Sequence, residues 1–204
     1  MSEDIEDTIL KIVILGASTV GKTSMFIRYF QKEFKTTIST MGVDFKMKFF
    51  KFEGKKIKVN YIDTAGQEKF RSISQNYLKG TDGVILVFDI TKKESFDLIN
   101  YWEDFIKKNS KPNIGKILFG NKLDLENERE VEYEEGKNLA DKLECKYYEG
   151  SAKTGENIEV VMNEIAKISY FENKKSEGNR KSLRISSSGS IQVEPPKKKF
   201  CCKK

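Results

Sequence analysis

Residues 16–23 read GASTVGKT and match the pattern of a phosphate-binding loop, Gly-x-x-x-x-Gly-Lys-Ser/Thr. The apolar run ILKIVIL at 9–15 precedes the loop, and a segment with helical spacing of apolar residues begins at Lys22. The two glycines let the backbone curl, so that successive N–H groups and the start of a helix face a phosphate group. A plain glycine turn is the alternative interpretation, and the complete pattern between a strand and a helix argues against it.

Outward from the loop, apolar strands alternate with amphipathic helices. Strands are expected in 9–15, in 43–63 as a hairpin with a tight turn at Glu53-Gly54, in 82–91, in 115–122 and at the start of 146–153. Helices are expected after the loop and near 95–109, 132–143 and 156–171. This alternation predicts an α/β domain with a mostly parallel sheet covered on both faces, whose ligands bind at the carboxyl ends of the strands.

The residue types of the loop suit a nucleotide and its metal ion. Lys22 would reach the β- and γ-phosphates, where it is also a candidate catalytic residue, and the Thr23 hydroxyl would bind Mg²⁺. Kinases, ATPases and GTPases all use such a loop, so the loop alone does not choose a base. The predicted phosphate-binding residues are Gly16, Ser18, Thr19, Val20, Gly21, Lys22, Thr23, Ser24 and Gly66.

Two further segments favour guanine over adenine. In NKLD, residues 121–124, the carboxylate of Asp124 can accept both the N1–H and the exocyclic amino group of guanine, a donor pair that adenine lacks. Asn121 can bond the O6/N7 side, and the stem of Lys122 can cover the base. In SAK, residues 151–153, the Ala152 N–H is placed to donate to guanine O6. Alone, either segment could be an ordinary turn. The predicted guanine-binding residues are Phe34, Asn121, Lys122, Asp124, Ser151, Ala152 and Lys153.

Hydrolysis of the nucleotide would depend on the segment DTAGQE at 63–68. Asp63 can hold Mg²⁺ through a water, the Gly66 N–H can reach a γ-phosphate, and Gln67 is the candidate for orienting the attacking water. Thr40 can add its hydroxyl to the Mg²⁺ ligands while a γ-phosphate holds its loop closed. The predicted Mg²⁺ ligands are therefore Thr23, Thr40 and Asp63.

The net charge of +6 over 204 residues is concentrated at one end of the chain. Residues 173–204 contain ten Lys or Arg and two Glu, so they carry +8 and the remainder carries −2. A basic tail suits an anionic membrane surface as well as nucleic acid. No apolar run approaches the ~20 residues of a membrane span, and the acidic N-terminus is no secretory signal. We expect a domain over 1–172 and a disordered tail over 173–204 in the reducing cytoplasm.

Over roughly residues 8–172 these motifs, in this order, resemble those of the Ras superfamily of small GTPases. The segments MGVDF (41–45), KKIKV (55–59), DTAGQEKFRSI (63–73) and GVILVFDIT (83–91) narrow the resemblance to the Rab family. It implies a single P-loop NTPase domain of the small G-protein type, with a six-stranded sheet. It also implies a GTP/GDP switch that hydrolyses GTP slowly with Mg²⁺ and regulates vesicle-mediated transport.

The resemblance also explains the end of the chain, VEPPKKKFCCKK. Rab proteins with such an ending are typically prenylated on both cysteines, here Cys201 and Cys202. One lipid chain binds a membrane marginally, so two give stable anchoring. The implied location is the cytoplasmic face of an intracellular or plasma membrane, in exchange with the cytosol. Ile191 and Val193 resemble the motif through which Rab tails meet the prenylation escort protein.

The implied partners are those of a regulated switch. They are a guanine-nucleotide exchange factor, a GTPase-activating protein, a GDP-dissociation inhibitor, the escort protein and effectors, with no nucleic acid and with a monomeric G domain. Ser72 lies where some Rabs are phosphorylated. The resemblance assigns effector and switch contacts to Met41, Gly42, Val43, Asp44, Phe45, Ile62 and Tyr77.

At three positions the chain departs from the family pattern. Ile62 stands where Rabs usually carry Trp, so the effector face should be less aromatic. Thr19 is β-branched at a loop position that is more often Gly or another small residue. Phe34, the candidate to stack on guanine, lies one residue closer to Thr40 than is usual.

Three other functions remain as alternatives to a GTPase switch. The chain could be a GTP-bound membrane tether that hardly hydrolyses, although Gln67 argues against this. It could be a nucleic-acid-binding protein with a basic tail. A phosphotransferase is disfavoured, because the chain shows no lid-like insertion and Asp124 selects guanine.

Overall fold

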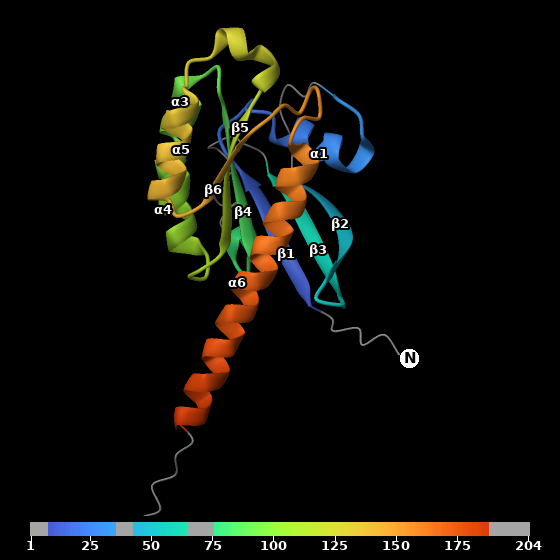
Figure 1. Ribbon diagram of the computed structural model, residues 1–204, viewed down its shortest axis with the longest axis vertical. Helices are drawn as coiled ribbons and strands as arrows, with labels where there is room; N and C mark the ends of the chain where they lie inside the picture. Colours follow the sequence, from blue (N-terminus) through green and yellow to red (C-terminus); the bar gives the residue numbers. More distant parts are fainter. Residues whose placement is uncertain (1–7, 36–42, 65–75, 188–204) are drawn as a thin grey trace, which may run out of the picture.

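A computed structural model describes residues 8–35, 43–64 and 76–187, with the side chains of 177–187 left out (Figure 1). Six strands form one sheet in the order β2-β3-β1-β4-β5-β6. All neighbouring pairs are parallel except β2 with β3. The strands are β1 Ile9–Leu15, β2 Val43–Phe52, β3 Lys55–Thr64, β4 Gly83–Asp89, β5 Gly115–Asn121 and β6 Lys146–Glu149. The predicted six-stranded, mostly parallel sheet is confirmed.

The helices follow the predicted alternation. They are α1 Lys22–Gln31, α3 Lys93–Asp97, α4 Ile99–Asn109, α5 Tyr133–Lys142 and α6 Ile158–Ser187, with a 3₁₀ segment at Leu123–Glu128. The hairpin turns at Glu53 and Gly54, whose φ angles of 50° and 80° are those of a tight turn that suits the twist of two antiparallel strands. No described helix is both long and apolar enough to cross a membrane.

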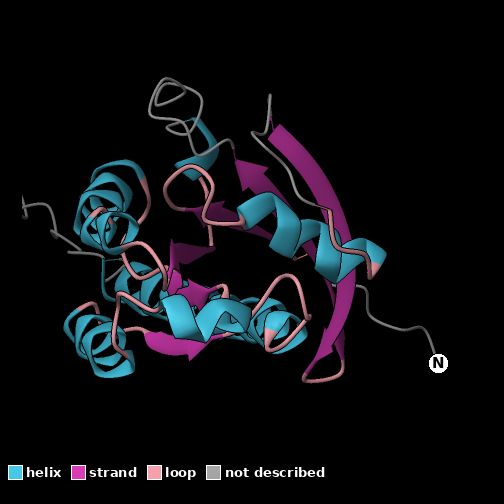
Figure 2. Ribbon diagram, turned by 90° about the horizontal axis from the view of Figure 1, so that it is seen from above, coloured by secondary structure: helices cyan, strands magenta, loops and turns pink. Residues whose placement is uncertain are grey.

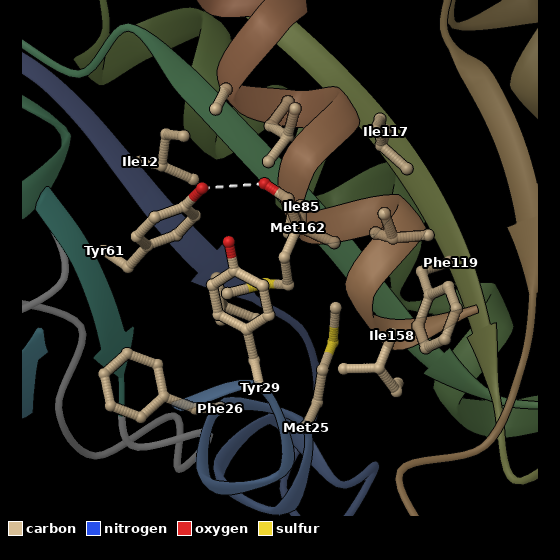
Figure 3. Close-up of a cluster of buried hydrophobic side chains, with 14 of the residues drawn as sticks. Ile12, Met25, Phe26, Tyr29, Tyr61, Ile85, Ile117, Phe119, Ile158 and Met162 are labelled. Atoms are coloured by element: carbon tan, nitrogen blue, oxygen red, sulfur yellow. Dashed lines mark hydrogen bonds between the residues drawn. The ribbon is translucent and has the colours of Figure 1, made fainter. Parts of the chain in front are cut away.

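The inner strands β4 and β5 and most of β1 are buried on both faces of the sheet, which explains why they read as apolar runs (Figure 2). Side chains of β1 alternate between the two layers: Ile12 packs with α1 and α6, while Val13 packs with α3, α4 and α5. On the α1–α6 side, the buried Tyr61 hydroxyl donates to the Met162 carbonyl at 2.7 Å (Figure 3). This bond links α6 to β3 of the sheet.

Helix α6 continues to Ser187, beyond the helix end near residue 171 that the sequence predicted. Asn173 donates to Asp82 at 3.2 Å, and Lys174 pairs with Glu53 at the tip of the hairpin. The Tyr170 hydroxyl also donates to Glu53, at 3.2 Å. Sequence composition missed this because extending a helix that is already formed costs little, and polar side chains supply its contacts. The helix crosses the domain boundary predicted at 172, and residues 188–204 lie outside the described residues.

Candidate functional site

Apart from Phe34, the predicted nucleotide and Mg²⁺ residues that the structure describes lie at the carboxyl ends of β1, β3, β5 and β6. Four loops or strand ends meet there: the loop from Leu15 to Lys22, the end of β3, the turn after Asn121, and the turn after Glu149. In Figure 1 these lie at the upper end of the sheet, beside the start of α1. A separate cavity of about 840 Å³ is lined by residues of α4, α5 and α6 and includes none of these loops.

Both loop glycines are required by close contacts. A Cβ on Gly16 would lie 2.1 Å from the Val87 carbonyl oxygen, and one on Gly21 would lie 2.3 Å from the Asn121 side-chain nitrogen. Thr19 has a φ of 63°, a left-handed conformation that is unfavourable for a β-branched residue. The expected stiffening at Thr19 is therefore accompanied by backbone strain, of a kind that is frequent at functional sites.

The Lys22 ammonium is folded back onto the loop. Lys22 is 4% exposed, and its Nζ donates to the carbonyls of Gly16 at 2.9 Å and Ala17 at 2.6 Å. Burial lowers the pKa of Lys22 to about 8, although the charge of Asp63 opposes this shift. A buried cation with carbonyl partners needs a negative charge beside it, and a nucleotide phosphate provides one.

Thr23 and Asp63 come together, as predicted for two ligands of one metal ion. The Thr23 hydroxyl donates to Asp63 Oδ2 at 2.6 Å. Asp63 is fully buried, and burial raises its pKa to about 6, against the Thr23 hydrogen bond and the charge of Lys22. Its other oxygen, Oδ1, is buried without a hydrogen-bond partner among the described residues. A hard cation such as Mg²⁺ fits this oxygen-rich pair, because it would satisfy the free carboxylate oxygen. Thr40 lies outside the described residues.

Asn121 connects the phosphate loop to the SAK loop. Its Nδ2 donates to the Val20 carbonyl at 2.7 Å, and its Oδ1 accepts the Ala152 N–H at 3.0 Å. The sequence assigned both Asn121 and the Ala152 N–H to guanine directly. In this structure they are bonded to each other, so Asn121 also holds the two loops in register.

Asp124, which is predicted to bind the edge of guanine, has partners for both of its carboxylate oxygens. Asp124 Oδ1 accepts from the Ser151 hydroxyl at 2.5 Å, and Lys153 lies 3.4 Å from its Oδ2. Ser151 also accepts the N–H groups of Lys153 and Thr154, each at 3.1 Å. The loop thus orients the carboxylate whose two oxygens must face the donors of the base.

Two supporting residues were missed by sequence reasoning. Asp89 is fully buried, and its Oδ2 lies 2.5 Å from the Lys122 ammonium, which fixes the stem predicted to cover the base. The position of Asp89 at the carboxyl end of β4 could have identified it. Arg28 bonds the SAK loop from α1, and no sequence signal indicated that contact.

The predicted effector residues that are described lie around β2 and β3. The rings of Phe45 and Tyr77 are 5.6 Å apart, and Ile62, the register partner of Phe45 on β3, is 3% exposed. Val43 and Asp44 begin β2. Phe34 is 40% exposed after the end of α1. The predicted residues outside the described ranges are Thr40, Met41, Gly42, Gly66, Gln67, Ser72, Ile191, Val193, Cys201 and Cys202.

Known proteins are similar to this chain over most of its length. The model of the Ras family matches residues 11–170. GTP-binding protein ypt2 of Schizosaccharomyces pombe is 39% identical over 168 residues, which cover 82% of this chain and 84% of that protein. Ras-related protein Rab-13 of Mesocricetus auratus is 38% identical over 194 residues, covering 95% and 94%. Ras-related protein Rab-8A of Gallus gallus is 41% identical over 175 residues, covering 85% and 84%.

Proposed function

Because this chain belongs to the Ras family and, within it, to the Rab small GTPases, we propose that the residues assembled above bind and hydrolyse GTP. As a Rab-type small GTPase, the protein binds GTP and GDP, hydrolyses GTP and regulates vesicle-mediated transport. The family works with exchange factors, activating proteins, a dissociation inhibitor and effectors. The observation that best supports our residue assignment is the pairing of Thr23 with the buried, half-satisfied Asp63 beside Lys22.

In the proposed mechanism the chain positions GTP and water rather than reacting covalently. Lys22 and the loop N–H groups hold the β- and γ-phosphates and stabilise the charge that spreads over the γ-phosphoryl oxygens. Thr23 and Asp63, with Thr40, would hold Mg²⁺, which when bound neutralises charge on the β- and γ-phosphates. Gln67 orients the water for in-line attack, which yields GDP and inorganic phosphate.

Slow turnover is expected, because the proposed machinery includes no arginine aimed at the γ-phosphate. A rate on the order of 10⁻⁴ s⁻¹ follows by analogy with the intrinsic hydrolysis of GTP by Ras. An activating protein would supply the missing cation, and an exchange factor would open the site to release GDP.

Replacing Gln67 with Leu should slow single-turnover hydrolysis of preloaded GTP by about tenfold, because the attacking water loses its hydrogen-bond partner. Loss of γ-phosphate from the full chain with Mg²⁺ measures this, with Lys35→Gln as a control at an exposed lysine. If the unmodified chain releases phosphate no faster than the background rate, the proposal of GTP hydrolysis is wrong. A GTP-bound membrane tether is then the better description. The strained Thr19 would then be the first residue to replace, with Gly.

We also propose that the membrane anchor is carried by Cys201 and Cys202. Rab homologues act on intracellular membranes, and the lysines of the tail would add attraction to anionic lipid, at about 1 kcal/mol each near the surface. Replacing both cysteines with Ser should shift the prenylated protein from vesicle pellets to the supernatant in sedimentation. Replacing one should give partial binding, since a single chain anchors weakly. Equal sedimentation of all three forms would exclude the two-cysteine anchor.

Effectors are proposed to dock on the uncovered part of the β2–β3 face. Ile9, Phe45 and Met47 are each more than half exposed there and line a groove of about 480 Å³. Lys11 and Lys46 border the same groove, so an apolar helix flanked by acidic residues would complement it. Binding of such a partner should slow amide hydrogen exchange in β2, and unchanged exchange would place the docking site elsewhere.

A further inference from the structure

The guanidinium of Arg28 in α1 donates to backbone carbonyls of one distant segment, the SAK loop, and of the residue that follows α1. Its Nε donates to Ala152 O at 2.9 Å and its Nη2 donates to Lys153 O. Its Nη1 donates to the carbonyl of Lys32, the C-cap residue that follows α1, at 3.2 Å. The planar fork of an arginine suits this task, because its donors point in fixed directions that a lysine cannot reproduce.

These contacts fix the peptide groups around Ala152. The Ala152 carbonyl accepts from Arg28, while the Ala152 N–H points to Asn121 and the residue itself is 3% exposed. That N–H is the donor predicted for guanine O6. A donor held in advance loses little conformational freedom on binding, so its hydrogen bond contributes more to affinity.

The same helix also holds the phosphate end of the site. Lys22 and Thr23 begin α1, and Arg28 follows six residues later, ~9 Å along the axis. Ser24 donates to the Lys35 carbonyl at 3.0 Å, which ties the segment after α1 to the same helix. One rigid helix therefore fixes the distance between the phosphate groups and the guanine loop.

We propose that Arg28 is a positioning residue for the guanine base, which holds the Ala152 N–H in place from α1 and thereby slows release of bound GDP. The inference rests on the proposed guanine-nucleotide function. It adds to that function a residue outside the nucleotide-binding motifs.

The test is the release rate of a ribose-labelled fluorescent GDP from the full chain with Mg²⁺ and excess unlabelled GDP. Arg28→Ala should release GDP about tenfold faster, the effect of losing one well-placed hydrogen bond to the base. Arg28→Lys should show most of that acceleration, because the donors of one ammonium radiate from a single nitrogen and cannot reproduce the fork that reaches these three carbonyls. Lys32→Gln is the matched control: it removes an exposed ion pair with Glu159 but keeps the Lys32 carbonyl, so its rate should change less than about twofold.

A second nucleotide separates positioning from general support of the fold. In 6-thio-GDP a weakly accepting sulfur replaces O6, while the donors that face Asp124 remain. Arg28→Ala should accelerate its release less than about threefold, because the contact that Arg28 supports is already weak. Equal acceleration for both nucleotides, or none for GDP, would overturn the proposal. If the unmodified chain does not retain GDP longer than 6-thio-GDP, the guanine contact of Ala152 itself is wrong, and the inference falls with it.

Discussion

Replacing Lys22 with Ala is expected to lower the affinity for GDP and GTP by about 10²–10³-fold. Lys22 is almost fully buried, and its ammonium has loop carbonyls as hydrogen-bond partners, so a phosphate is the charge that completes its surroundings. Charge-assisted hydrogen bonds in such a site contribute about 1.5–3 kcal/mol each, and Lys22 would make more than one. Isothermal titration with GDP and Mg²⁺ measures the change directly.

Two controls make the Lys22 result interpretable. Lys35→Gln removes an exposed lysine that pairs with Glu33 at 3.4 Å, and GDP affinity should stay within about twofold. Circular dichroism of Lys22→Ala shows whether the sheet and helices form, since loss of the bonds to Gly16 and Ala17 also loosens the loop. A folded variant that binds GDP within threefold of the unmodified chain would remove Lys22 from the phosphate site.

Replacing Asp124 with Asn should exchange the base that the site prefers. Asp124 has two acceptor oxygens for the guanine N1–H and amino group, whereas an amide has one acceptor and presents its N–H₂ toward the amino group. GDP affinity should fall about 10²-fold or more, because a buried donor is left unpaired. Xanthosine diphosphate carries a carbonyl in place of that amino group, so its affinity should rise.

The Asp124 result has a close control in the same 3₁₀ segment. Glu126 has a side chain that is 68% exposed and lies 3.5 Å from Arg129, so Glu126→Gln should leave both affinities unchanged. Competition between GDP and xanthosine diphosphate against a fluorescent nucleotide measures the two affinities together. Equal losses for both nucleotides would show that Asp124 supports the loop rather than reading the base.

The strands and the phosphate loop could be predicted because local residue chemistry determines them. Strands β1, β4 and β5 are buried on both faces, so each reads as an apolar run whatever surrounds it. The loop needs glycine at Gly16 and Gly21 because their backbone φ angles are positive, 148° and 95°, which is a local requirement. The chemistry of Asp124 follows from its carboxylate alone.

What the sequence did not predict depends on pairing between distant segments. Arg28 and Ala152 are 124 positions apart, and no residue pattern in either segment indicates that the two are in contact. Asn121 looked like a base contact, and its second role appears once Val20 and Ala152 are seen on either side of it. The extension of α6 was missed because composition describes the tail as polar, whereas Glu53 and Asp82 provide partners that lie far away in the chain.

The length of α6 affects how far the G domain can lie from an anchor at the end of the chain. Helix α6 has 30 residues, and the stretch from Lys174 to Ser187 projects ~20 Å at 1.5 Å per residue. The next fourteen residues, up to Cys201, can span at most ~48 Å when extended. With lipid chains at the proposed cysteines, the end of the G domain at Lys174 could sample positions up to about 70 Å from the point of attachment. With such an anchor, the projecting helix would hold the G domain away from its own bilayer, where a partner on an approaching vesicle would meet it first.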